Sequence, residues 1–151
     1  MISKGKGVKV EVVNVSSEAE EGAIIKTVSV TETVQNAIDI LENNVRHIPV
    51  YRDRDTLMCK VSSIYYVESV DKRTYVYTKD GCYEATYRLY ELENMLDFNF
   101  LRCSKSLIVN IRKIQSVKSE LNGRMIALLL NGEQVVISRS YVKDLKRKLG
   151  I

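Results

Sequence analysis

The stretch Thr74–Thr86, TYVYTKDGCYEAT, indicates the fold class of this chain of 151 residues. Tyrosine, valine and threonine fill its first half, and these residue types favour strands. Asp80-Gly81 then supplies a turn pair that is typical of a two-residue β-hairpin. Asn122-Gly123 and Asn131-Gly132 also lie between alternating apolar runs. Three such signals predict a meander of antiparallel strands, and hence a mainly β, α+β fold with short helices.

Further strands and two short helices are predicted around this hairpin. Tyr51–Val61 and Ile64–Ser69 have the composition of strands. Leu89–Leu96 and Ser140–Leu149 each carry apolar residues at helical spacing on one face. The second of these helices is expected to turn its lysines and Arg147 outward.

Residues 1–47 predict a smaller strand-strand-helix extension. Val8–Val15 and Ala23–Val30 alternate apolar and polar residues as half-buried strands do. From Thr31 the apolar spacing becomes helical, and Ser29 and Glu32 are predicted to form a capping box. The helical apolar positions are Val34, Ala37, Ile38, Leu41 and Val45.

The extension is also a candidate dimerisation element. About 45 residues cannot easily form a core of their own, so these apolar faces should pack on the rest of the chain or on a second copy. We favour self-association, with the Val8–Val15 strand and the helix residues Val34, Ile38 and Leu41 in the contact.

The only proline, Pro49, marks the predicted end of the extension. Asn43-Asn44 gives the preceding helix a natural end, and the residue before a proline disfavours helix. We therefore expect a linker at His47–Val50, with residues 1–47 forming the extension and residues 48–151 forming the main domain.

The formal net charge of +4 conceals a strong asymmetry along the chain. Residues 1–47 carry five Lys/Arg against seven Asp/Glu, and residues 48–97 carry seven against nine, so each segment has a net charge of −2. Residues 98–151 carry eleven against three, a net charge of +8. This local excess makes a polyanion the first partner to consider, although many small domains have basic faces that are only solvated.

The sequence offers little for catalysis, metal binding or membrane insertion. Its three cysteines, Cys59, Cys82 and Cys103, are far apart, and His47 is the only histidine. A zinc site or a nucleophile–histidine pair therefore has almost no basis. The sequence also lacks a glycine-rich phosphate loop and a run of about 18 uncharged apolar residues. We expect a cytoplasmic protein that is not an enzyme and holds no cofactor.

A set of motifs connects the main domain to a known family. YVES (Tyr66–Ser69), TYVYTKDG (Thr74–Gly81) and YRLYELENML (Tyr87–Leu96) are followed by FLRCSKSLIVNIRKIQSV (Phe100–Val117) and VISRSYVKDLK (Val136–Lys146). In this order they resemble the LytTR DNA-binding domain of bacterial transcription regulators over about residues 48–150. The resemblance implies a fold of antiparallel strands with short helices that reads duplex DNA through loops rather than through a recognition helix.

Three segments carry the predicted DNA contacts. The loop before residues 74–78 presents two cations and a hydroxyl. Residues 102–110 place donors suited to phosphates and base edges around the apolar pair Leu107-Ile108. The start of the final helix offers free backbone N–H groups, hydroxyl caps at Ser138 or Ser140, and an arginine that can reach a guanine edge. The predicted DNA-binding residues are Lys72, Arg73, Thr74, Arg102, Ser104, Lys105, Asn110, Arg139, Ser140 and Lys143.

Two other functions stay open from the sequence. The basic face could meet an acidic protein partner, or the domain could bind single-stranded RNA through aromatic side chains on one sheet face. Most tyrosines of the main domain fall at strand positions, which favours cross-strand packing over base stacking. They include Tyr65, Tyr75, Tyr77, Tyr83 and Tyr87.

Assembly and control are also predicted. A twofold contact is the commonest way to occupy two half-sites, so we expect a homodimer, at least on DNA. The 47 residues before the main domain are too few for the receiver module that many members of the family carry. Resemblance to shorter, stand-alone members implies control by expression level or by a separate, often membrane-bound, partner protein rather than by aspartyl phosphorylation within this chain.

Overall fold

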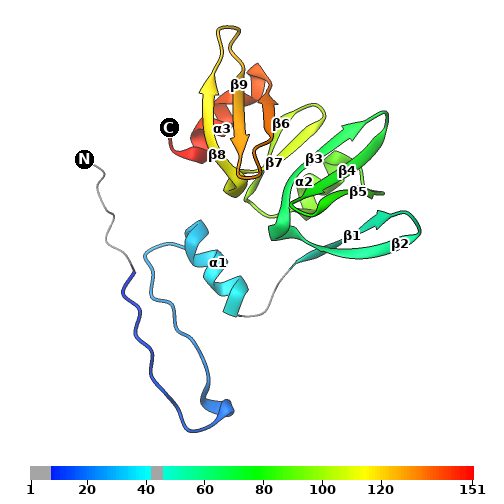
Figure 1. Ribbon diagram of the computed structural model, residues 1–151. Coiled ribbons are helices and arrows are strands. Elements are labelled where there is room, and N and C mark those ends of the chain that lie inside the picture. The colour runs from blue at the N-terminus through cyan, green and yellow to red at the C-terminus, as the bar shows by residue number, and fades with distance from the viewer. Residues whose placement is uncertain (1–7, 42–45) are drawn as a thin grey trace. The chain divides into compact units, whose positions relative to one another are not determined.

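The computed structural model describes residues 8–41 and 46–151, which belong to two compact units that divide between Glu42 and Asn43 (Figure 1). The described part of the first unit contains the 3-10 turn η1 (Glu18–Glu20) and the helix α1 (Glu32–Leu41). The second unit contains β1 (His47–Arg52), β2 (Asp55–Lys60), η2 (Val61–Ser63), β3 (Ile64–Val70), β4 (Arg73–Thr78), β5 (Gly81–Ala85), α2 (Leu89–Met95), β6 (Phe100–Ser104), β7 (Leu107–Asn110), η3 (Ile111–Lys113), β8 (Ile114–Ser119), β9 (Met125–Leu129), β10 (Gln134–Ile137), η4 (Arg139–Tyr141) and α3 (Val142–Leu149). None of the helices described here is long and apolar enough to cross a membrane.

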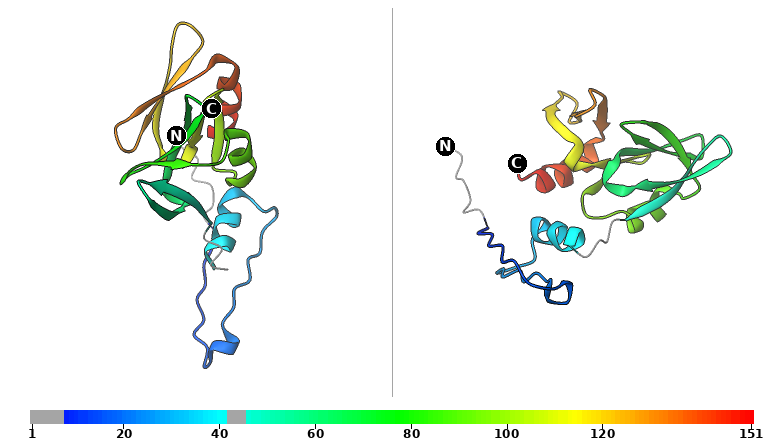
Figure 2. Two further views of the ribbon diagram at one scale, coloured as in Figure 1. Left: turned by 90° about the vertical axis from the view of Figure 1, so that its right-hand side faces the viewer. Right: turned by 60° about the horizontal axis from the view of Figure 1, so that its bottom comes forward.

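The first unit differs from the predicted strand-strand-helix arrangement. Residues 8–15 and 23–30 run antiparallel as the two sides of an open loop (Figures 1 and 2), but neither segment is a strand. Every side chain in both segments is exposed. A strand needs a neighbouring backbone that satisfies its N–H and C=O groups, and these segments have no such neighbour among the described residues. The two strand predictions are therefore wrong for the single chain.

The predicted helix of the first unit is present, with a different cap. The Val34 N–H donates to Thr31 Oγ1 at 3.3 Å, and the Gln35 N–H donates to the Thr31 carbonyl at 2.9 Å. Thr31 is thus the N-cap, and the predicted capping box of Ser29 and Glu32 is wrong. The predicted apolar positions of this helix lie within α1, except Val45, which lies outside the described residues.

The second unit consists of two antiparallel sheets. Seven strands follow the order β2-β1-β5-β4-β3-β7-β6, and three follow the order β10-β9-β8. Each predicted turn pair lies at a hairpin: Asp80-Gly81 between β4 and β5, Asn122-Gly123 between β8 and β9, and Asn131-Gly132 between β9 and β10. The predicted mainly β, α+β fold class is confirmed.

The first hairpin of this unit lies where the sequence predicts a linker followed by one long strand. β1 begins at His47 and contains Pro49, so the expected linker residues lie in a strand. Pro49 pairs with Met58 of β2, whereas β5 pairs with β1 only at Tyr51. The backbone N–H that proline lacks is therefore not needed for a hydrogen bond to β5. The turn between β1 and β2 contains Asp53 with a left-handed φ of 55°. The turn contains no glycine, so the sequence carries no signal for it.

Strand β7 separates two clusters of buried side chains. Ile108 packs into a cluster that contains Leu92 of α2, whereas Leu107 and Val109 pack into a cluster that contains Leu145 of α3. Successive strand residues point to opposite faces, and all four residues of β7 are buried. This short strand is therefore the wall shared by both hydrophobic cores.

Asn110 closes β7 with a buried amide that is 2% exposed. Its Nδ2 donates to the Ile64 carbonyl at 2.9 Å, and its Oδ1 accepts the Arg112 N–H at 3.0 Å. The amide thereby ties the start of β3 to the end of β7 and begins the η3 turn. Because both ends of the side chain are engaged inside the domain, the prediction of Asn110 as a DNA contact is wrong.

We expect Asn110→Ala to lower the free energy of unfolding by about 1–3 kcal/mol, because the Ile64 carbonyl loses its partner in a buried place. Urea denaturation measures this loss. Asn94→Ala is the control, since the Asn94 amide lies exposed on α2, and it should change the stability by no more than about 0.5 kcal/mol. Equal losses in the two variants would contradict the role assigned to Asn110.

Candidate nucleic-acid interface

Two backbone hydrogen bonds bring three turns of the second unit together. The Ser69 N–H donates to the Ser106 carbonyl at 2.8 Å and joins the end of β3 to the β6–β7 turn. The Ser138 N–H donates to the Cys103 carbonyl at 2.9 Å and joins the residue before η4 to the end of β6. Figure 1 accordingly shows the β6–β7 hairpin between β3 and the three-stranded sheet. Three segments that are far apart in sequence thus form one continuous edge.

The β3–β4 turn presents one lysine. Asp71 and Lys72 connect Val70 to Arg73, and their φ values of 50° and 64° are the positive pair that a type I′ hairpin turn requires. Lys72 is exposed and has no ion-pair or hydrogen-bond partner among the described residues.

The next two predicted residues of this segment already belong to β4. Arg73 is exposed and lies 3.5 Å from Glu84 in an ion pair. Thr74 is only 6% exposed, because the register of β4 turns its side chain inward. The prediction that Thr74 presents its hydroxyl to DNA is therefore wrong.

Arg102 braces the β6–β7 turn from within. Its Nε donates to the Ser104 carbonyl at 2.8 Å, its Nη2 donates to the Lys105 carbonyl, and its Nη1 lies 2.9 Å from Glu93. The Ser106 N–H also donates to Ser104 Oγ at 3.1 Å. The guanidinium predicted as a DNA contact is thus occupied in shaping the turn, and Lys105 is left exposed at its tip without a partner among the described residues.

Cys103 fills the space beneath this turn. The side chain is fully buried in the cluster of β7, β9 and α3. Burial raises the pKa of its thiol to about 12, so the sulfur stays protonated at neutral pH and acts as a small apolar group.

The third segment of the edge precedes α3. Arg139, Ser140 and Lys143 are all exposed, and none of their side chains has a hydrogen-bond or ion-pair partner in the part of the chain that the structure describes. The predicted hydroxyl caps are not formed, because Ser138 makes no side-chain cap bond to η4 and α3 begins after Tyr141 instead.

Two cations at the end of α3 have partners within the same domain. Arg147 lies 3.8 Å from Asp144, and Lys148 Nζ donates to the Phe98 carbonyl. Lys143 in the first turn of α3 and Lys146 in its last turn make no such contact among the described residues.

The β8–β9 turn supports Arg139, a contact that the sequence did not predict. Gly123 has a φ of 83°, and a Cβ added there would lie 2.9 Å from Arg139 Cδ. The turn backbone therefore packs closely on the aliphatic stem of this arginine. Hydrogen bonds from the Glu120 N–H to the Arg124 carbonyl and from the Gly123 N–H to the Glu120 carbonyl fix the turn. In the sequence, Asn122-Gly123 indicates only a hairpin.

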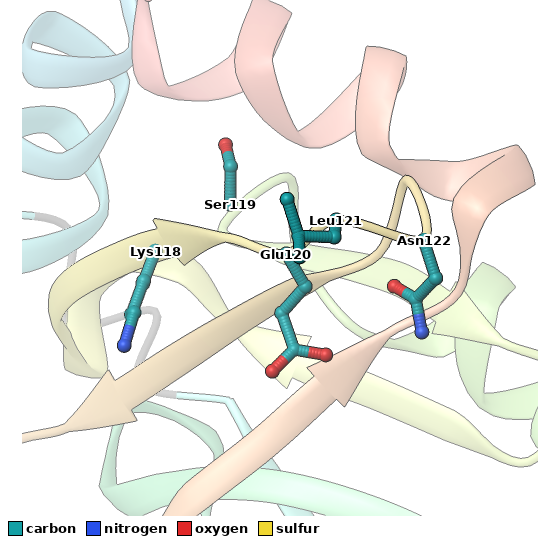
Figure 3. A pocket seen from close by; sticks show the side chains of 5 residues that line it. All are labelled: Lys118, Ser119, Glu120, Leu121 and Asn122. Carbon is teal, nitrogen blue, oxygen red and sulfur yellow. The ribbon is translucent and has the colours of Figure 1, made fainter.

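The same turn borders a shallow hollow of about 400 Å³, lined by Lys118, Ser119, Glu120, Leu121 and Asn122 (Figure 3). The side chains of Lys118 and Glu120 point to one side, whereas those of Ser119 and Leu121 point to the other. Polar groups do not converge here as they do in small-molecule sites. The candidate site is therefore the basic edge and not this hollow.

A β-rich domain that presents exposed cations from adjoining turns has the features of a nucleic-acid-binding module. Residues 54–150 match the family model of the LytTr DNA-binding domain. The structure is similar to that of a LytTr DNA-binding domain from Bacillus cereus, with a TM-score of 0.67 and 28% identity, over 70% of this chain and 97% of that one. The chain therefore belongs to the LytTR family of DNA-binding domains, which is a family of DNA-binding regulators and not of enzymes.

One curated relative is named as a transcriptional regulator and another as a sensory transduction protein. An uncharacterized HTH-type transcriptional regulator of Staphylococcus aureus is 31% identical over 121 residues, which cover 80% of this chain and 81% of that protein. The sensory transduction protein LytT of Enterococcus faecalis is 30% identical over 105 residues, which cover 69% of this chain. The match spans only 43% of the length of LytT.

Gly123→Ala is expected to displace Arg139 and to weaken binding to a preferred DNA site by about tenfold, within the range for loss of one base contact. Gly132→Ala is the matched control. It places alanine at a similar φ of 86° in another Asn-Gly hairpin, but its Cβ meets no atom within 4 Å.

Fluorescence anisotropy with duplex DNA measures both variants, alone and combined with Arg139→Ala. If Gly123 acts through Arg139, Gly123→Ala adds no loss to the Arg139→Ala protein. Equal affinities of Gly123→Ala and Gly132→Ala would show that the support of Arg139 is unimportant.

Proposed function

We propose that this chain is a transcription regulator that reads duplex DNA in a sequence-specific way through the turns of its β-rich domain. The observation that carries this proposal is the joined edge, from which Lys72, Lys105 and Arg139 project. These cations are exposed and have no ion-pair partner among the described residues, so they are available to phosphates and base edges. Family membership supports the same function.

Lys105 and Arg139 are the proposed base contacts. A tight turn is narrow enough to enter the major groove, which is about 12 Å wide. Lys105 stands at the tip of the β6–β7 turn, and Arg139 lies in η4, which the Ser138 N–H joins to the end of β6. Arginine can donate two parallel hydrogen bonds to guanine O6 and N7, and lysine can bind the same acceptors. The close packing of the β8–β9 turn on Arg139 limits the freedom that this side chain would lose on binding.

Phosphate contacts are proposed for the polar residues that flank Lys105 and Arg139. They are Lys72, Arg73, Ser104, Ser140 and Lys143, all at the edge or beside it. Arg102, Asn110 and Thr74 support the edge from inside the fold. Phosphate contacts fix the orientation of a domain on the duplex, whereas base contacts select the sequence.

The aromatic side chains give little support to single-stranded RNA binding. The rings of Tyr66 and Tyr77 stack on each other with centroids 4.3 Å apart, and Tyr65 is buried. The Arg52 guanidinium covers the Tyr83 ring at 4.1 Å. These contacts use the ring faces on which unpaired bases would stack.

The proposal includes a homodimer on DNA and a cytoplasmic location. Two copies would occupy two half-sites, as twofold regulators commonly do. Control by a separate membrane-bound partner stays a prediction from the family resemblance.

Affinity for duplex DNA should fall steeply with salt, because residues 98–151 carry a net charge of +8. If about four to six phosphates are neutralised per domain, the slope of log K against log salt should be about −4 to −5. Anisotropy titrations at several salt concentrations give this slope. A flat salt dependence would favour a different class of partner, and tighter binding to single-stranded RNA than to duplex DNA would overturn the proposal.

Lys105→Ala and Arg139→Ala should each weaken binding to the preferred site by about 1–3 kcal/mol and flatten the sequence preference. The preferred DNA site is first identified by selection from a random duplex library. Lys146→Ala and Arg147→Ala serve as controls on the outer face of α3 and should weaken all sequences about equally. The assignment of the reading turns is wrong if the α3 variants erase the preference while Arg139→Ala leaves it intact.

A further inference from the structure

The first unit exposes apolar side chains at high density. Nine of the nineteen exposed large apolar side chains of the described residues lie within residues 8–30. They are Val8, Val10, Val12, Val13, Val15, Ile24, Ile25, Val28 and Val30. Soluble monomers rarely leave a large apolar surface uncovered, so this segment has the composition of an interface.

The two sides of the open loop match each other as antiparallel strands. When residues 8–15 and 23–30 are aligned with Val8 opposite Val30, Val10 falls opposite Val28 on the same face. On the other face Val13 falls opposite Ile25. Cross-strand pairs of β-branched residues stabilise a sheet, and both segments have the required period of two.

Within one chain the two segments do not pair as strands. No backbone hydrogen bond joins the two segments in the described residues. The connection between them contains the η1 turn, in which the Glu20 N–H donates to the Ser17 carbonyl and Ser17 Oγ donates to Glu20. It lacks the Asn-Gly or Asp-Gly pair that closes the hairpins of the second unit. Figures 1 and 2 show the resulting open loop.

We propose that residues 8–15 of one copy pair with residues 23–30 of a second copy, and the reverse, in an exchanged intermolecular sheet. A twofold axis generates both pairings at once, because each segment then meets its complement in the partner. The segments are already extended and unpaired, so pairing satisfies backbone groups and covers apolar side chains without breaking existing strands. A second copy is chosen as the occupant because the complementary segment lies in this same loop. The proposal does not depend on DNA binding.

Cysteine cross-linking of the full chain distinguishes exchange from closure within one chain. In a Cys82→Ser background, which removes the exposed native thiol, Val10→Cys and Val28→Cys proteins of different tag length are mixed and oxidised. Random pairing of equal amounts gives about twice as much mixed dimer as either like-with-like dimer, and exchange predicts a mixed disulfide dimer well above that ratio. Val10→Cys mixed with Ile24→Cys is the control out of register and should yield much less mixed dimer.

The double variant Val10→Cys/Val28→Cys completes this test. Exchange predicts a covalent dimer on a non-reducing gel, whereas an internal disulfide in a monomer would show a hairpin within one chain and overturn the proposal. Absence of any disulfide between these positions would overturn it as well.

Sedimentation equilibrium gives a second, independent measurement. The natural chain should form a reversible dimer, and Val10→Lys/Val28→Lys should weaken it by about tenfold or more, because two charges would enter the apolar contact. Glu11→Gln, at a polar position of the loop, is the control and should leave the dissociation constant of the dimer unchanged. A natural chain that stays monomeric at high micromolar concentration would refute exchange, as would equal dimerisation of the lysine variant.

Discussion

Burial of both faces of β7 is the constraint on which the second unit depends. Four residues divide two hydrophobic cores, with Ile108 facing α2 and Val109 facing the three-stranded sheet and α3. The strand pairs with β3 on one side and β6 on the other. A shift of one residue in either register would exchange the contents of the two cores, so the register is strongly determined.

The position of the turns that form the basic edge depends on this strand. β7 begins directly after the tip that carries Lys105, and the neighbouring bonds at Ser106 and Cys103 connect this tip to the other two turns. The Arg102 guanidinium then holds the tip in place by donating to the Ser104 and Lys105 carbonyl groups. Cations on separate loops are consequently presented from one rigid support, which is the arrangement that lowers the entropy lost on binding.

The sequence predicted those features that have a local chemical signal. Asp80-Gly81, Asn122-Gly123 and Asn131-Gly132 locate three hairpins, because glycine alone adopts their positive φ without steric strain. The β1–β2 hairpin was not predicted, because Asp53 and not a glycine adopts the positive φ in its turn and because Pro49 suggested a linker. Burial was the other source of error, since the polar residues Thr74 and Asn110 look the same in a sequence whether they point outward or inward. Alternation at 8–15 indicates a strand but carries no information on which chain supplies its neighbour.

The β3–β4 turn places a charged side chain in a strained backbone conformation. Lys72 adopts a φ of 64°, in a region that disfavours side-chain-bearing residues by about 1–2 kcal/mol relative to glycine. A glycine at this position would relieve the strain and would remove a charge from the basic edge. Homologues adapted to higher temperature therefore face opposing pressures at this position, and a glycine there would call for a replacement cation elsewhere on the edge.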